Sequence, residues 1–322
     1  MKVKFLILTI SSLLILSGCN KIENKNTESN NNTEIVNEIT TEEIKYYQGE
    51  SEFYNLKYGD KDVNAYDLYL PNKINLSEAQ NVFLVIHGGS FQRGDKSDMS
   101  DFCNRLRNDG FIVINMNYSL MEDENLDVTA FTMLDDITAC IKNANNWLNN
   151  LEIKTNSIAL CGYSAGGHLA TLYSYSRPNE SDIPIKFVVD MVGPTDFHKT
   201  TWGFEEGITS EIGDEEYLNY SIYHLSGKSP KEVSDEEKES IINSISPASF
   251  VTENTIPTIL AYGDSDNVVG TKQQEPLLAK LDENNVLYDY ILFNNCGHTL
   301  TDNSEKFEEL YQLVLNYSEK YF

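Results

Sequence analysis

Short apolar runs alternate with longer helix-like stretches along most of the chain after residue 63. Runs such as Val82–Ile86 and Phe111–Met116 are apolar at nearly every position, which is typical of strands buried on both faces. Residues 127–149 instead show apolar positions at helical spacing. Strands that alternate with helices predict an α/β fold, with a mostly parallel central sheet flanked by helices. In such a sheet, functional side chains gather beyond the carboxyl ends of the strands.

The same patterns predict the individual elements. Strands are expected at 63–70, 82–86, 111–116, 157–160, 186–192, 258–262 and 287–293. Helices are expected at 97–108, at 127–149, from 165 onward and at 304–321. The alternation breaks at 196–247, which is acidic and irregular but contains the aromatic residues Trp202, Phe204, Tyr217, Tyr220 and Tyr223. Loops of more than ~15 residues are usually functional or disordered, and the aromatic residues favour a functional one. We therefore interpret 196–247 as a cap insertion over the sheet; the alternative is a long mobile loop.

The first 43 residues are predicted to lie outside the folded domain. Residues 1–18 combine two lysines, a short apolar run and small residues, as a signal peptide does. The sequence LSGC at 16–19 resembles the lipobox of bacterial lipoproteins, which implies that Cys19 is lipidated at the extracytoplasmic face of the cell membrane. The alternative is an ordinary signal peptide in which Cys19 has no role. Residues 19–43 are polar and predict a disordered tether, which leaves 44–322 as one folded domain.

Charge and cysteine content exclude several kinds of partner. The 322 residues include 24 Lys and Arg against 50 Asp and Glu, for a net charge of −26. Nucleic-acid binding requires clustered positive charge, so no nucleic-acid partner is expected. The five cysteines are too few for a disulfide scaffold at this length and show no metal-ligand spacing, so no metal is expected. The sequence does not indicate an oligomeric state.

Gly162–Gly167, with the sequence GYSAGG, joins a predicted strand to a predicted helix. In that setting, Gly-x-Ser-x-Gly is typical of a strained turn that exposes a serine hydroxyl. The residues two positions before and after the serine are glycines because strand and helix pass too closely for a Cβ. We therefore predict Ser164 as a nucleophile; the alternative is a serine in a purely structural glycine turn.

His87-Gly88-Gly89-Ser90 follows another predicted strand. During acyl transfer a carbonyl oxygen becomes an oxyanion, which requires two or more N–H groups already directed at it. Glycines let the backbone approach such an oxygen closely. We expect one donor from the Gly88–Ser90 loop, near Gly89 or Ser90, and another from the amide of Ala165. Which loop amide points inward stays open.

A catalytic serine needs a histidine and a carboxylate, and in this kind of fold they follow the serine in the order acid, then histidine. Of the five histidines only His298 satisfies that order. His168 lies on the helix after the serine and is expected to pack in the interior. The remaining three, which precede either the serine or any plausible acid, are His87, His198 and His224.

Two acidic residues follow the predicted strand 258–262. We predict Asp266 as the acid, because it is the last one before the chain turns to Val268 and Val269. Asp264 is then expected to bond to its own backbone in the turn. Cys296, two residues before His298, could be a reactive thiol, but no basic neighbour lowers its pKa and a packing role is favoured.

These segments together resemble the α/β-hydrolase superfamily, specifically bacterial carboxylesterase-like members near the hormone-sensitive-lipase and BD-FAE groups. The matching segments are AYDLYLP at 65–71, IHGGSF at 86–91, NYSL at 117–120, GYSAGGHLA at 162–170, SPASFV at 246–251 and GH at 297–298. The resemblance implies no cofactor, an acid at Asp266 and hydrolysis of short acyl or aryl esters; some members deacetylate plant polysaccharides. Ser90 stands where many relatives have glycine, and Gly270 where they often have proline.

The sequence thus predicts a serine carboxylesterase that acts on short-chain acyl esters, including acetyl esters of carbohydrates, through an acyl-enzyme. A small-molecule or carbohydrate ester is the expected partner, and membrane contact is expected only through the lipid anchor. A serine peptidase or amidase of the same fold would use the same residues, and turnover of aminoacyl amides would favour it. A non-catalytic binding protein is the third interpretation, since a fold alone does not fix a function.

Overall fold

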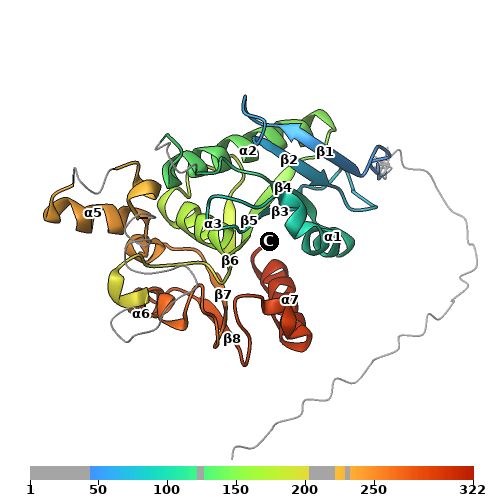
Figure 1. Cartoon of the computed structure of the whole chain (residues 1–322). Coiled ribbons are helices and arrows are strands. Elements are labelled where there is room, and N and C mark those ends of the chain that lie inside the picture. Colours follow the sequence, from blue (N-terminus) through green and yellow to red (C-terminus); the bar gives the residue numbers. More distant parts are fainter. Residues whose placement is uncertain (1–43, 122–126, 203–221, 229–232) are drawn as a thin grey trace, which may run out of the picture. The chain divides into compact units, whose positions relative to one another are not determined.

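An eight-stranded sheet forms the centre of the computed structural model, which describes residues 44–121, 127–202, 222–228 and 233–322 (Figure 1). Its strand order is β1-β2-β4-β3-β5-β6-β7-β8. The strands are β1 (Glu52–Lys57), β2 (Ala65–Tyr69), β3 (Gln80–Ile86), β4 (Ile112–Met116), β5 (Thr155–Tyr163), β6 (Ile185–Met191), β7 (Thr258–Gly263) and β8 (Tyr288–Phe293). Pairs from β4 to β8 are parallel, whereas β2 is antiparallel to both of its neighbours. This is the α/β-hydrolase fold, as the sequence predicted.

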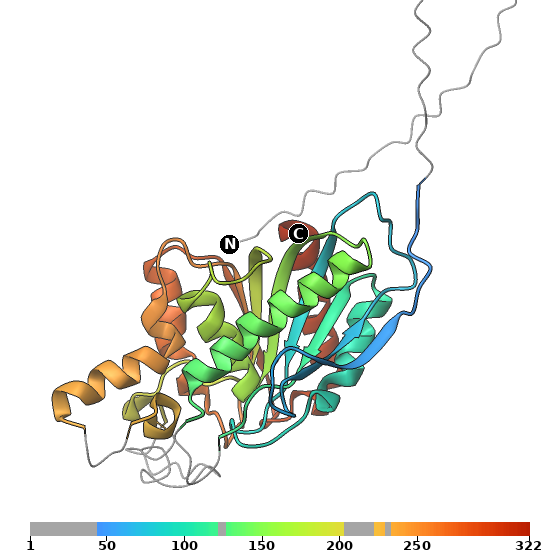
Figure 2. The same ribbon diagram turned by 90° about the horizontal axis from the view of Figure 1, so that it is seen from above.

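Helices cover both faces of the sheet (Figures 1 and 2). The main ones are α1 (Ser100–Asn108), α2 (Ala130–Asn150), α3 (Ala165–Ser176), α5 (Asp235–Ile245), α6 (Glu275–Glu283) and α7 (Ser304–Tyr321). Helices α1 and α7 pack on one face, and α2 and α3 lie on the other. Nearly every residue of α3 is buried, so this helix is held on all sides directly behind β5 and β6.

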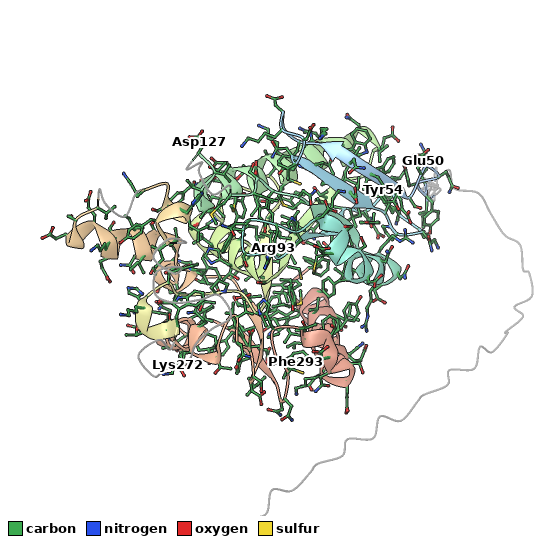
Figure 3. The ribbon with its side chains drawn as sticks, in the orientation of Figure 1. Glu50, Tyr54, Arg93, Asp127, Lys272 and Phe293 are labelled. Atoms are coloured by element: carbon green, nitrogen blue, oxygen red, sulfur yellow. The ribbon has the colours of Figure 1, made fainter. Side chains whose placement is uncertain are left out.

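The apolar runs are buried strands because they pair on both edges and are covered on both faces. Val82 to Ile86 are fully buried and pair in register with both β4 and β5. The ring of Phe83, on β3, packs against that of the C-terminal residue Phe322, with the ring centroids 5.5 Å apart. Side chains fill the space between sheet and helices (Figure 3). Each large apolar side chain buried in this way stabilises the fold by about 1.5–3 kcal/mol.

Strand β1 and helix α6 were not predicted. Strand β1 pairs only with β2 and leaves several side chains exposed, so its sequence EFYNLK lacks the apolar run of a central strand. Helix α6 has nine residues and only two buried leucines, too few for a clear helical period. In addition, the predicted helix 97–108 begins as a 3₁₀ turn, Lys96–Met99, capped by the side chain of Asp95, and continues as α1.

The predicted cap, 196–247, is described in three pieces. They are a 3₁₀ turn (Lys199–Trp202), a helical stretch at 222–226, and helix α5, which begins at a Ser234 capping box. Trp202 packs against Phe197 and is buried, as is Tyr223. Phe204, Tyr217 and Tyr220 lie outside the described residues.

Ile44–Phe322 form one compact unit. The predicted signal peptide, Cys19 and the predicted tether fall in 1–43, outside the described residues. Within the described ranges, no helix has the length and apolar character needed to cross a membrane.

Candidate active site

Ser164 occupies the sharp turn between β5 and α3. Its backbone angles are φ 54° and ψ −121°, a strained conformation that costs roughly 1–3 kcal/mol for a non-glycine residue. A Cβ on Gly162 would stand 2.0 Å from the carbonyl oxygen of Gly166, and one on Gly166 would stand 2.2 Å from that of Ile86. Glycine is therefore required on both sides of the turn, which confirms the close approach predicted from GYSAGG.

Three side chains from the carboxyl ends of β5, β7 and β8 meet above the sheet. His298 Nε2 lies 2.9 Å from Ser164 Oγ, and His298 Nδ1 lies 2.8 Å from Asp266 Oδ2. The Asp266 side chain is fully buried, whereas that of His298 is 21% exposed. This is the arrangement in which an imidazole can accept the serine proton while the carboxylate fixes its tautomer.

The Asp266 carboxylate is held in place by its own turn. Its Oδ1 accepts hydrogen bonds from the amides of Val268 and Val269, at 2.8 and 2.9 Å. Oδ2 is thereby left for His298. Asp264 is exposed and its carboxylate accepts from the Ser265 hydroxyl, not from its own backbone as predicted. Of the two acidic residues, the structure brings only Asp266 to His298.

The loop after β3 packs directly against the serine. A Cβ on Gly88 would lie 2.9 Å from the Tyr163 carbonyl oxygen and 3.1 Å from the Ser164 Cβ. Gly89 has φ +119° and its carbonyl oxygen accepts from the amides of Gln92 and Arg93, which closes the loop on itself. Ser90 also has a positive φ, 52°. The loop is therefore a tight, preformed turn whose backbone borders Ser164 without an intervening side chain.

The expected oxyanion donors have no other partner. Among the hydrogen bonds of the described residues, none is donated by the amides of Gly88, Gly89 or Ser90. The amide of Ala165 is at the first position of α3, where helical amides lack an internal acceptor. The amide of Ser164 itself is used, because it donates to the Met191 carbonyl at 2.7 Å. The free loop amides, together with that of Ala165 at a helix N-terminus, suit a developing negative charge.

His87 and His168 make buried contacts of their own. The buried ring of His87 stacks on Tyr118, and its Nδ1 lies 2.7 Å from the Gly88 carbonyl oxygen. His168 is buried between the rings of Phe91 and Phe197, where burial lowers its pKa to about 4. His168 is thus a packing residue, as predicted.

Two further predicted bystanders have structural partners of their own. His198 lies between Asp196 and Glu239. Cys296 is buried, and burial raises the pKa of its thiol, which disfavours a reactive thiolate. In the described ranges, no three His, Cys, Asp or Glu side chains are grouped so as to hold a metal ion.

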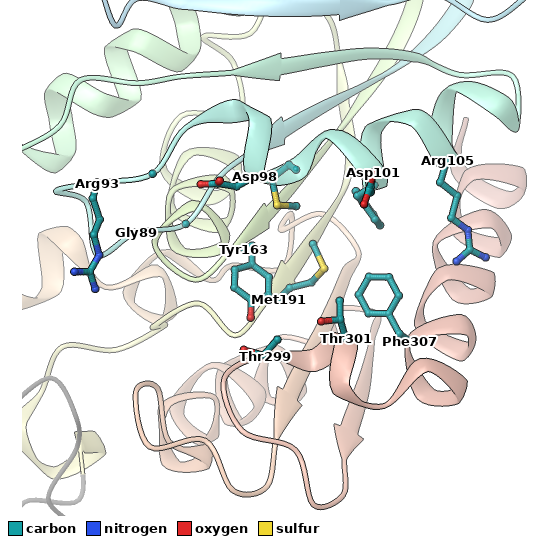
Figure 4. Close-up of a pocket in the computed structure, with 14 residues that line it drawn as sticks. Gly89, Arg93, Asp98, Asp101, Arg105, Tyr163, Met191, Thr299, Thr301 and Phe307 are labelled. Atoms are coloured by element: carbon teal, nitrogen blue, oxygen red, sulfur yellow. The ribbon is translucent and has the colours of Figure 1, made fainter.

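A cavity of about 740 Å³ opens beside the serine turn, between α1 and α7 (Figure 4). Gly88, Gly89 and Tyr163 border it on the serine side, and Thr299 borders it next to His298. The rest of its lining combines apolar side chains with charged ones: Met99, Phe102, Met191 and Phe307, and Arg93, Asp98, Asp101 and Arg105. Trp202, a cap aromatic, does not line this cavity but is buried. Phe102 and Phe307 come from helices far apart in the chain, so sequence patterns mark them only as core positions.

Comparison with known proteins gives partial matches in sequence. Kynurenine formamidase of Salmo salar is 25% identical over 118 residues, which are 37% of each chain. The non-reducing polyketide synthase atr1 of Stereocaulon alpinum is 26% identical over 142 residues, 41% of this chain and 5% of the synthase. The chain thus spans well under half the length of these curated relatives.

Solved structures match over more of the chain. A truncated carbohydrate esterase from gut microbiota superimposes with a TM-score of 0.66 and 19% identity, covering 84% of this chain and 97% of that one. Esterase B of Lactobacillus Rhamnosis (HN001) gives 0.67 and 19%, covering 83% and 85%. At this level of identity the likeness establishes the fold. Residues 66–281, which hold the serine turn, the glycine loop and Asp266, match the BD-FAE family, and the chain belongs to that family.

Proposed function

We propose that this protein is a serine carboxylesterase that hydrolyses short-chain acyl esters through an acyl-enzyme, and that acetyl esters of carbohydrates are among its substrates. The observation that carries the proposal is the continuous contact from Asp266 through His298 to Ser164 Oγ, at 2.8 and 2.9 Å, beside unpartnered loop amides. Family membership and the esterase names of the structural neighbours support the same reaction class.

In the first half of the reaction, His298 Nε2 accepts the Ser164 proton as Oγ attacks the ester carbonyl. The Asp266 carboxylate balances the charge of the imidazolium and keeps Nδ1 protonated. The carbonyl oxygen becomes an oxyanion, which accepts from the amide of Ala165 and from one amide of the Gly88–Ser90 loop. His298 then gives its proton to the leaving alcohol.

In the second half, water replaces the alcohol. His298 removes a proton from the water, which attacks the acyl-enzyme, and the same amides hold the second oxyanion. Collapse releases the carboxylic acid and returns the proton to Ser164. The fully buried position of the Asp266 side chain keeps its carboxylate from turning toward solvent between the two halves.

The cavity between α1 and α7 supports an ester substrate in which the alcohol part is bulky and the acyl group is small. Its volume of about 740 Å³ falls within the range of small-molecule sites, roughly 300–1,000 Å³. An acetyl group alone would fill little of it, whereas a sugar or an aryl alcohol would fill much more. Thr299 and Thr301 offer hydroxyl groups for a polar arm, and Phe102 with Phe307 offers an apolar wall.

The test is ester hydrolysis by the full chain beside Ser164→Ala, on p-nitrophenyl acetate, butyrate and octanoate. The proposal predicts turnover that declines with acyl length and is abolished by the substitution. Acetate release from acetylated xylan and acetylated sugars then tests the carbohydrate substrate. Turnover of octanoate but not of acetylated carbohydrates would contradict that part, and turnover of aminoacyl amides in preference to esters would favour an amidase.

We also propose that Cys19 carries a lipid that holds the protein at the extracytoplasmic face of the cell membrane. The support is the sequence of residues 1–19, with its basic start, apolar run and LSGC ending. A diacylated cysteine gives firm anchoring, whereas one acyl chain gives marginal binding. Detergent-phase partitioning of the full chain, lost in Cys19→Ala, is the expected result; equal partitioning of the two would contradict the anchor.

A further inference from the structure

A fully buried carboxyl group lies directly behind the serine turn. Asp190, on β6, is fully buried and pairs in register with Gly162 of β5. A Cβ on Gly167, in the first turn of α3, would lie 2.3 Å from Asp190 Oδ1, and one on Gly193 would lie 2.4 Å from it. The carboxyl group is therefore packed tightly against the N-terminal turn of the helix that follows Ser164. Its chain neighbour Met191 accepts the hydrogen bond of the Ser164 amide.

The hydrogen bonds of this group constrain its protonation. Asp190 Oδ1 accepts from the Gly193 amide at 2.8 Å. Asp190 Oδ2 lies 3.1 Å from the hydroxyl oxygen of Tyr262, and that hydroxyl makes a shorter hydrogen bond with the Gly193 carbonyl oxygen. A phenol has one proton and a carbonyl can only accept. If Tyr262 donates to Gly193, its contact with Asp190 is a hydrogen bond only when Asp190 is the donor.

A second aspartate–tyrosine pair shows the opposite order of distances. Tyr317 donates to the exposed carboxylate of Asp289 at 2.8 Å and lies 3.5 Å from the Thr258 carbonyl oxygen. There the phenol proton goes to the carboxylate, as expected for an ionised acid. In the buried pair the carbonyl takes the shorter contact and the carboxyl group the longer one.

We propose that Asp190 is a neutral carboxylic acid in the working protein and acts as a positioning residue for the serine turn, donating from Oδ2 to Tyr262 while Oδ1 accepts from Gly193. This proposal rests on the proposed function for its kinetic consequence but not for the placement of the proton. A neutral group leaves the positive end of α3 available to the oxyanion. An ionised group against the same turn would oppose that field.

The surroundings of Asp190 agree with a neutral group. The titratable side chains that interact with it are Tyr262 on β7 and Tyr175 on α3. Burial holds both phenols in their neutral form, since it raises the pKa of each. No cation of the described residues pairs with Asp190. Burial likewise raises the pKa of Asp190, to about 7.

The discriminating substitution is Asp190→Asn. An asparagine accepts through its oxygen and donates through its NH₂ group, so it can make both bonds of a protonated Asp190, whereas an ionised Asp190 would accept twice. Infrared difference spectra of the full chain at pH 6, wild type against Asp190→Asn, should show the carbonyl stretch of a protonated carboxyl group in wild type. The thermal unfolding midpoint of Asp190→Asn at pH 6 should be no lower than that of wild type. Absence of that band, with a clearly lowered midpoint, would overturn the proposal.

The kinetic readout is the pH profile of kcat/KM. Wild type should lose activity several-fold as the pH rises past about 7, and Asp190→Asn should keep its activity over that range. Asp289→Asn, the matched control at the exposed pair, should leave the wild-type profile unchanged. Coincident profiles for wild type and Asp190→Asn would overturn the positioning role even where the infrared band is present. Absence of ester turnover in wild type would contradict the proposed function, but it would not affect the infrared test of the Asp190 proton.

Discussion

The Tyr163 hydroxyl donates a hydrogen bond to the backbone carbonyl of His298, so the residue before Ser164 holds the loop that carries His298. The two rings also pack edge to face, with centroids 5.7 Å apart. This contact links the end of β5 to the loop after β8 across the site. The contact therefore helps to set the distance between Ser164 and His298, in addition to the hydrogen bond between their side chains.

Tyr163→Phe removes that hydroxyl and keeps the ring that borders the cavity. One neutral hydrogen bond is worth about 1 kcal/mol, so we expect kcat to fall roughly five- to tenfold. KM should change little, because the ring remains. A steady-state comparison on p-nitrophenyl acetate checks this, and a change confined to KM would show that Tyr163 acts on substrate binding alone.

The two neighbouring acids should differ sharply in importance. Asp266→Asn removes the charge opposite His298 and favours the wrong tautomer, and in serine hydrolases such a change costs about 10⁴-fold in kcat. Asp264→Asn alters an exposed carboxylate that accepts from the Ser265 hydroxyl and should stay within about twofold of wild type. Comparable losses of kcat in the two variants would contradict the assignment of Asp266 as the carboxylate that acts on His298.

Gly88→Ala tests the contact between the glycine loop and the serine. The added Cβ would be 2.9 Å from a backbone oxygen, so the loop has to shift away from Ser164. Losing a well-aimed oxyanion donor costs roughly 10²–10³-fold in kcat. Gly110→Ala is the control, because Gly110 has φ +97° with no atom within 4 Å of its Cβ position. It should lower the free energy of unfolding while kcat stays unchanged.

The buried Asp190 also predicts how stability depends on pH. Its pKa rises from 3.8 in the unfolded chain to about 7 in the folded one, so between these values the folded state binds more protons. Its contribution to the free energy of unfolding therefore falls as the pH rises through this interval and is constant above it. Urea unfolding from pH 4 to 8 should show Asp190→Asn gaining on wild type up to about pH 7. A pH-independent difference would contradict this.

Much of the scaffold and the turn at Ser164 could be predicted because they depend on local sequence. Buried strands such as β3 are apolar throughout, and GYSAGG encodes a turn that only glycines permit at Gly162 and Gly166. The cavity could not be predicted, because it depends on how α1 and α7 approach each other over one face of the sheet. Asp190 was missed for a similar reason: within the run VVDM it resembles an ordinary interruption of a strand, and its partners come from β7 and from the turn after β6.

The central claim is that Ser164 is a nucleophile activated by His298. The most direct measurement is the site of covalent labelling by a fluorophosphonate, located by peptide mass spectrometry in the full chain, in Ser164→Ala and in His298→Ala. The account predicts a single adduct on Ser164 in wild type, no adduct in Ser164→Ala, and much slower labelling in His298→Ala. Absence of label on Ser164 in wild-type protein, or an unchanged labelling rate in His298→Ala, would contradict it.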